Sequence, residues 1–84
     1  MNKLFLLPII QGLTPSIAKK LSYQYNIPLN DYEINIFLPY LKENASYLIN
    51  LKNPTKKIYE DFYHKISIDS INKFILIVKR LGFN

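Results

Sequence analysis

Apolar side chains recur every three or four residues along most of this chain, which is the spacing of one face of an α-helix. The clearest stripe lies near the C-terminus and consists of Ile71, Phe74, Ile75, Val78 and Leu81. Ser67 precedes the stripe as a capping residue, and Asp69 would lie in the first turn, where the helix dipole favours an acid. Gly82 follows the stripe as a typical stop signal. The pattern predicts a helix that begins after Ser67 and ends near Gly82.

The pair Thr14-Pro15 predicts a helix over about residues 15–25, since it places a capping residue before a proline at the first helical position. The inner face of this helix would consist of Ile17, Ala18, Leu21 and Tyr25. Asn26 would end the helix, because asparagine tolerates a left-handed backbone and Pro28 disfavours helix at the residue before it.

A further helix is predicted over about residues 31–43. Asn30 and Glu33 have the spacing of a capping box. The buried stripe that follows consists of Ile34, Phe37, Leu38 and Leu41. Pro39 lies inside this stretch and removes one amide from the helical hydrogen-bond ladder, so we expect a kink there. Apolar residues continue in approximate phase over residues 45–51, which predicts a short helix that is either separate or joined to this one.

The pair Asn53-Pro54 repeats the signal of a cap before proline and predicts a helix over about residues 54–65. Its inner face would consist of Ile58, Phe62 and Ile66. The apolar runs at residues 4–7 and 74–78 could also form buried strands, but the start and stop signals around the second run favour helix. We therefore predict an all-α fold, a small bundle of four to six short helices in a single domain over residues 1–84, with one helix kinked near Pro39.

The N-terminal segment differs from these stripes because it is apolar on every side. It contains Leu4, Phe5, Leu6, Leu7, Ile9 and Ile10, and no helical orientation hides all of these side chains on one face. A cleavable leader is one interpretation, but the charge before the apolar stretch is weak and Pro8 interrupts it. A core helix is the simpler interpretation. The alternatives are a segment that docks against a partner or on a membrane surface.

A smaller surplus of apolar and aromatic side chains lies elsewhere. Leu76 and Ile77 fall outside the main C-terminal stripe, and Phe83 follows its end. Tyrosine, which occurs seven times, is enriched at protein interfaces. We predict a protein-interaction surface, serving a protein partner or a second copy of the chain. Its residues would be Leu4, Phe5, Leu6, Leu7, Ile9, Ile10, Tyr40, Tyr47, Ile77 and Phe83.

Composition excludes several classes of protein. The 84 residues contain no cysteine and only two glycines. The chain is too apolar for intrinsic disorder, has no thiol for a disulfide or a metal, and has no apolar run long enough to span a membrane. Without cysteines or a clear targeting signal, we expect a cytoplasmic protein. The abundance of Ile, Asn, Lys and Tyr is typical of an AT-rich genome.

The net charge of +5 is concentrated in the second half of the chain. This basic half supports an alternative hypothesis, in which the protein associates with nucleic acid through the phosphate backbone. The residues that would make these contacts are Lys52, Lys56, Lys57, Lys65, Lys73, Lys79 and Arg80. Sequence-specific reading is not expected, because arginine, which binds guanine and phosphate with two parallel hydrogen bonds, occurs only once.

No constellation in the sequence supports catalysis. Glu60, Asp61 and His64 have a helical spacing that could place two ligands on a metal, but a stable site needs three or four. The chain has no second histidine, no nucleophile elbow and no phosphate-binding loop. The predicted helix over 15–25, the turn over 26–30 and the helix from Asp31 look superficially like a helix-turn-helix. DNA reading is disfavoured, because Asp31 and Glu33 at the start of the second helix would face the phosphates. We predict a non-enzymatic protein without a cofactor or metal.

One resemblance adds to this interpretation. The residues that carry it are Leu13-Thr14, Leu21 through Tyr25-Asn26-Ile27-Pro28-Leu29, Leu41-Lys42-Glu43-Asn44 and Lys65-Ile66-Ser67. In the order of these features, residues 13–82 resemble a family of short uncharacterised helical proteins from low-GC Gram-positive bacteria. The resemblance implies a helical fold and supplies no catalytic or binding residues. In composition alone, the chain also resembles phage-encoded inhibitors of host proteins. We therefore expect an interaction module that self-associates or that inhibits or regulates a host protein.

Overall fold

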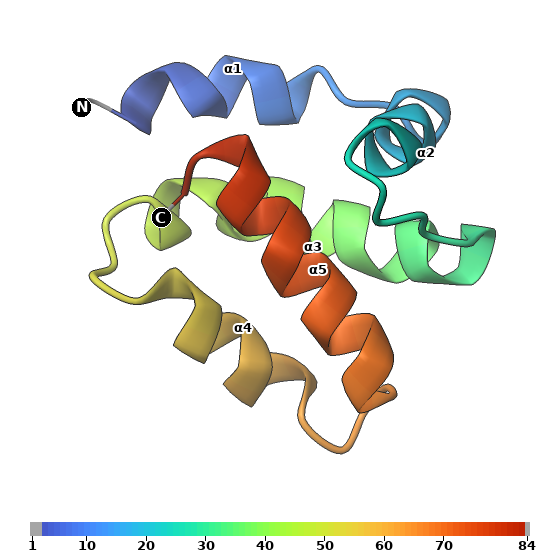
Figure 1. Cartoon of the computed structure of the whole chain (residues 1–84). Helices are drawn as coiled ribbons and strands as arrows, with labels where there is room; N and C mark the ends of the chain where they lie inside the picture. The colour runs from blue at the N-terminus through green and yellow to red at the C-terminus, as the bar shows by residue number, and fades with distance from the viewer. Residues whose placement is uncertain (1–2, 84) are drawn as a thin grey trace.

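The computed structural model describes residues 3–83, which form five α-helices and one short 3₁₀ helix (Figure 1). In chain order these are η1 (Lys3–Phe5), α1 (Leu6–Gln11), α2 (Pro15–Gln24), α3 (Asp31–Leu48), α4 (Pro54–Phe62) and α5 (Ile68–Leu81). No strand occurs within the described residues, which confirms the predicted all-α class and the helical interpretation of residues 4–7 and 74–78. α3 crosses behind α5, while α1 and α2 follow one another along the upper edge of the molecule (Figure 1).

Side-chain caps begin the four helices from α2 to α5 at the predicted residues. The side chain of Thr14 accepts from the Ile17 amide at 3.2 Å, that of Asn30 from Glu33 at 2.8 Å, that of Asn53 from Lys56 at 3.3 Å and that of Ser67 from Ser70 at 3.2 Å. Each of these bonds satisfies an amide that has no partner inside its own helix. Asn26 (φ 61°) and Gly82 (φ 110°) adopt the left-handed backbone after α2 and α5, as the sequence predicts.

Two predicted helix ends are wrong, whereas the alternative in which residues 45–51 join the preceding helix is confirmed. The segments at residues 31–43 and 45–51 form one helix, α3, which runs through Pro39 and ends at Leu48. Pro39 is exposed, so its ring meets water rather than the core. The kink at Pro39 stays a prediction. α4 ends at Phe62 instead of continuing to residue 65, because the chain turns out of the helix at the next residue.

Four aromatic rings form the centre of the core and connect α3, α4 and α5. Phe37 stacks on Phe74 with ring centroids 4.4 Å apart and an angle of 2° between the planes. Phe37 also meets Phe62 edge to face at 5.4 Å, and Tyr40 lies 4.7 Å from Phe62. Such aromatic pairs add stabilisation beyond the area that they bury.

α2 packs less deeply than the sequence predicts. Ile17, which was expected on the inner face, is 47% exposed, whereas Ser22 is fully buried. The Ser22 hydroxyl donates to the Lys19 carbonyl at 2.7 Å and accepts from the Leu29 amide at 3.1 Å. These two bonds satisfy the buried hydroxyl and attach the chain after α2 to the helix itself. The inner face of α2 therefore turns toward Ser22 and away from Ile17.

The beginning of α1 lies against the end of α5. Leu6 and Ile10 of α1 are buried, and a Cβ added at Gly82 would lie 3.9 Å from Leu6 Cδ1. α1 is also attached to α3, since Gln11 Nε2 donates to the Lys42 carbonyl at 3.0 Å and Lys42 Nζ donates to the Gln11 carbonyl at 3.2 Å. The N-terminal helix is thus part of the bundle, in agreement with the core-helix interpretation of this segment.

Candidate interaction surface

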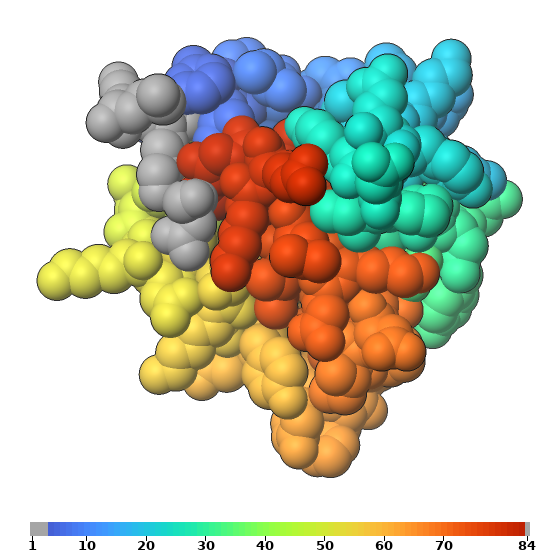
Figure 2. Space-filling model, in the orientation of Figure 1, coloured from blue at the N-terminus to red at the C-terminus, as the bar shows by residue number. Residues whose placement is uncertain are grey.

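The outer side of η1 and α1 carries three large apolar side chains that the bundle leaves in water. Leu4 is 56% exposed, Phe5 51% and Ile9 47%, while Leu6 and Ile10 point inward. Because Phe5 and Ile9 are one helical turn apart, they lie side by side. We call Leu4, Phe5 and Ile9 the η1–α1 face. In Figure 2 this segment runs along the upper edge of the molecule, next to the end of α5.

Four of the residues predicted for the interaction surface are buried and cannot contribute to it in this fold. They are Leu6, Ile10, Ile77 and Phe83. Ile77 is buried because the inner side of α5 follows Ile71, Phe74, Ile77 and Val78 rather than the predicted stripe. Phe83 is buried because the left-handed Gly82 turns the chain back, and the Phe83 amide donates to the Val78 carbonyl at 3.3 Å.

Three further predicted residues do not join the η1–α1 face. Leu7 is half-buried against the core. Tyr40 is also half-buried, and its hydroxyl donates to Asp61 Oδ2 at 2.5 Å across the contact between α3 and α4. Tyr47 is exposed, but its ring centroid lies 6.0 Å from Lys57 Nζ, also on the side of α3 that meets α4. The predicted surface therefore reduces to Leu4, Phe5 and Ile9.

The contact between α3 and α4 includes a small polar network beside the aromatic rings. Asp61 accepts from Tyr40 and also pairs with Lys57, whose Nζ lies 2.8 Å from Asp61 Oδ1. Burial and the hydrogen bond to Asp61 raise the pKa of the Tyr40 hydroxyl, so this tyrosine stays protonated. Burial would raise the pKa of the Asp61 carboxyl, but the hydrogen bonds from Lys57 and Tyr40 outweigh it and lower this pKa. The network stabilises the packing of the two helices.

Glu33 forms a second network, between the beginnings of α3 and α5. It is 3% exposed, and its carboxylate accepts from the Ser70 hydroxyl at 2.5 Å and from the Asn30 amide at 2.9 Å. Burial alone would raise the pKa of the Glu33 carboxyl. The hydrogen bonds that it accepts and the nearby Lys73 charge outweigh burial, so its pKa lies below the ordinary value. A carboxylate held in this way serves helix packing and does not face a nucleic-acid groove.

Two of the seven basic residues considered for nucleic acid have acidic partners. Lys57 pairs with Asp61, and Lys73 Nζ lies 3.5 Å from Glu33 Oε2. Of the other five, Lys65 precedes α5, whereas Lys79 and Arg80 lie in its last turn. Since an α-helix rises about 1.5 Å per residue, α5 separates these positions by roughly 20 Å. The seven residues are therefore spread along the molecule, and two of them are neutralised by acidic partners.

His64 lies outside α4 and does not share a helical face with Glu60. α4 ends at Phe62, and His64 adopts a left-handed backbone with φ 67°. Among the described residues, no group of three or more His, Asp or Glu side chains could hold a metal ion. The structure instead places the His64 ring against Tyr63, with centroids 3.9 Å apart. Sequence reasoning missed this contact, because it depends on a turn that the helical spacing did not predict.

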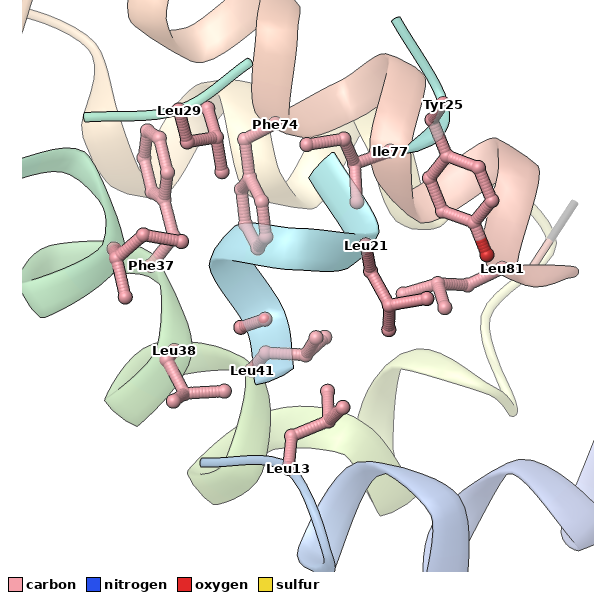
Figure 3. Close-up of a pocket in the computed structure, with 12 residues that line it drawn as sticks. Leu13, Leu21, Tyr25, Leu29, Phe37, Leu38, Leu41, Phe74, Ile77 and Leu81 are labelled. Carbon is pink, nitrogen blue, oxygen red and sulfur yellow. The ribbon is translucent and has the colours of Figure 1, made fainter. Parts of the chain in front are cut away.

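A narrow cavity of about 40 Å³ lies between α2, α3 and α5 (Figure 3). Its lining is aliphatic or aromatic, and the Tyr25 hydroxyl is the one oxygen among the side chains drawn (Figure 3). Ligand pockets usually occupy roughly 300–1,000 Å³, so this space is too small for a metabolite. It reflects the shallow packing of α2.

A wider and open hollow, of about 480 Å³, lies over the outer side of α2. Its lining residues are Ser16, Lys19, Lys20, Tyr23 and Gln24. Lys19 is already paired with Asp31, with Nζ 2.8 Å from Oδ1. The hollow lacks the enclosed apolar walls that are typical of small-molecule sites.

No protein-family model, curated protein or solved structure matches this chain. The resemblance to short helical proteins of low-GC Gram-positive bacteria therefore stays a prediction. Within residues 3–83, none of the helices combines the length and hydrophobicity that crossing a membrane requires.

Proposed function

We propose that this chain is a non-enzymatic interaction module that inserts the η1–α1 face into an apolar groove of a partner protein. The observation that supports this most directly is the exposure of about half of each of three adjacent apolar side chains, Leu4, Phe5 and Ile9. Each side chain that stays half in water leaves unrealised on the order of 1 kcal/mol of hydrophobic burial free energy. A docked partner would recover this free energy.

The absence of charged residues within α1 supports an apolar partner, although Lys3 of η1 precedes Leu4. The sequence of α1 is Leu-Leu-Pro-Ile-Ile-Gln, so docking this helix would desolvate no charged side chain of its own. Leu76 of α5 provides a contrast, because it is equally exposed at 50% but has Lys73, Lys79 and Arg80 within one turn. Cations around a single leucine are typical of an ordinary solvated surface.

The size of the η1–α1 face favours a grooved partner over a second copy of the chain. Three half-exposed side chains offer on the order of 300 Å², and a stable interface buries about 800 Å² on each partner. Two convex helices laid against each other would fall short of this area. A concave groove that encloses a short helix buries more surface for each residue, as in other helix-in-groove complexes. By occupying such a groove in the cytoplasm, the chain would inhibit or regulate its partner.

Site-specific photocrosslinking in the cells that produce the protein tests this proposal. A photoreactive phenylalanine analogue would be placed at Phe5, and the matched control would carry it at Leu76. We expect one protein to crosslink from position 5 and not from position 76. With that protein purified, Ile9→Glu should weaken binding about 10-fold or more, while Leu76→Glu should leave the affinity unchanged.

Two results would contradict the proposal. Equal crosslinking from positions 5 and 76 would show that the η1–α1 face has no special role. Light scattering that gives twice the monomer mass, and the monomer mass for Ile9→Glu, would show that a second copy covers the face instead.

A further inference from the structure

We infer that the corner between α4 and α5 binds an unpaired nucleobase of single-stranded nucleic acid on three exposed rings, those of Tyr59, Tyr63 and His64. We call these residues the ring stack. They lie on a different part of the chain from the η1–α1 face, and the inference does not depend on the proposed function. In Figure 2 the corner projects from the lower end of the molecule.

The geometry of the ring stack suits a base. The Tyr59 and Tyr63 rings lie 5.4 Å apart at 29°, and the His64 ring lies 3.9 Å from Tyr63 at 48°. Tyr59 is 38% exposed, Tyr63 is 46% exposed and His64 is also exposed. The three rings thus form a cluster of neighbouring exposed rings, in which Tyr59 stacks on Tyr63 and His64 is tilted against Tyr63. An unpaired base can stack on an exposed ring of such a cluster, since every base has a π-face.

The backbone conformation that holds His64 in the ring stack is itself unfavourable. α4 ends at Phe62, and the Lys65 amide bonds back to the Phe62 carbonyl at 2.9 Å. Between them His64 adopts φ 67°, a left-handed backbone that is unfavourable for a residue with a side chain. Glycine would close the same turn without this cost. The position therefore carries an imidazole ring where the turn alone would favour glycine.

Two lysines flank the ring stack and provide positive charge for the phosphates next to a stacked base. Lys56 lies one helical turn before Tyr59, and Lys65 follows His64. Both are exposed, and neither belongs to the ion pairs found within residues 3–83. Glu60 on α4 and Asp69 in the first turn of α5 are exposed acids near this corner, so the two lysines provide local phosphate contacts without a net positive charge. The charge of Lys57 is offset by Asp61.

These features favour single strands over duplexes. A duplex keeps its bases stacked on one another, and an exposed side chain cannot extend its column without unpairing them. Without an arginine at the corner, no bidentate pairing to a guanine edge by arginine is available, so we expect little preference for sequence. With two lysines rather than seven, it should engage about two phosphates.

The first test measures binding of fluorescent oligothymidylate by anisotropy at several salt concentrations. For single strands, log K falls with log salt with a slope of about −0.7 for each phosphate neutralised. Two lysines predict a slope of about −1.4, whereas engagement of all seven basic residues would give about −5. A duplex of the same length should bind more weakly. A slope near −5, or no binding at low salt, would overturn the inference.

The second test separates the rings from the fold. Tyr63→Leu should weaken binding about 10-fold, and the matched control Tyr32→Leu, which removes a tyrosine that is 65% exposed on α3, should leave it unchanged. His64→Gly keeps the left-handed turn and removes the ring, so binding should weaken while the protein remains at least as stable. Unchanged affinity in both Tyr63→Leu and His64→Gly would overturn the inference.

A measurement on the unmodified protein completes the test. His64 is the single histidine of the chain, so its imidazole protons give one distinct set of NMR signals. Stacking of a base should shift these signals as oligothymidylate is added, because ring currents act at short range. Binding that leaves them unmoved would place the nucleic acid elsewhere on the protein.

Discussion

Replacing the buried Glu33 should destabilise the protein strongly, because this side chain connects the beginnings of two helices. Its carboxylate accepts one hydrogen bond from the Ser70 hydroxyl at 2.5 Å and one from the Asn30 amide at 2.9 Å. Hydrogen bonds to a charged group contribute about 1.5–3 kcal/mol each and are not fully additive, so Glu33→Ala should cost about 2–4 kcal/mol. This is a large part of the roughly 4–12 kcal/mol that a domain of this length has available.

Glu33→Gln isolates the charge. The amide oxygen can still accept from Asn30 and the Ser70 hydroxyl can turn to accept a bond, so we expect a loss of about 1–2 kcal/mol at neutral pH. Because the pKa of the Glu33 carboxyl is lowered in the folded state, the unfolded state binds the proton more readily. The extra stability that Glu33 gives over Gln is therefore fully present above the ordinary glutamate pKa of about 4.3. It is lost as the pH falls through the lower pKa of the folded state.

Urea unfolding followed by circular dichroism, repeated from neutral to acidic pH, measures both effects. Glu43 provides the matched control, because it is an exposed glutamate on the same helix, and Glu43→Gln should change stability by less than about 0.5 kcal/mol. The reasoning would be refuted if Glu33→Ala lowered the free energy of unfolding no more than the control Glu43→Gln does. A Glu33→Gln loss that stays constant as the pH falls would refute the assigned role of the charge.

Two predictions concern the backbone. Pro39→Ala should stabilise the protein by about 1–2 kcal/mol, because the new amide can bond within α3 and the exposed ring is not part of the core. Thermal unfolding should show a higher midpoint, and an unchanged or lower one would contradict the cost assigned to the missing amide. Asn26 has φ 61°, so Asn26→Gly should be neutral or stabilising while Asn26→Ala should cost about 1 kcal/mol in urea unfolding. Equal stabilities of the two Asn26 variants would show that the left-handed turn does not limit stability.

The predictions that succeeded rest on interactions between residues close in sequence. Thr14, Asn30, Asn53 and Ser67 each bond an amide three residues later, so the side chain and its target lie within one turn of the chain. Nothing elsewhere in the molecule is needed to form these bonds. The helix starts were predictable for this reason, as was the left-handed stop at Gly82.

The interaction surface was only partly predictable. The sequence showed that no single helical face could hold the apolar side chains of residues 4–10, and the structure leaves Leu4, Phe5 and Ile9 in water. The sequence could not show that Phe83 would turn back into the core, because this depends on where α5 ends relative to α1. Hydrophobic periodicity gives the orientation of a helix about its own axis, and it does not give the neighbour that the helix meets.

The sequence by itself determined an all-α fold, the beginnings of four helices and an N-terminal segment with more apolar side chains than one face can bury. Only the tertiary structure decided the roles of Ser22, Glu33 and the ring stack. Ser22 is buried under a loop, Glu33 is bound by a serine 37 residues away, and His64 meets Tyr63 through a left-handed turn. The physical reason is that capping and periodicity are local properties of the chain, whereas burial of a polar group depends on partners brought together by the packing of helices far apart in sequence.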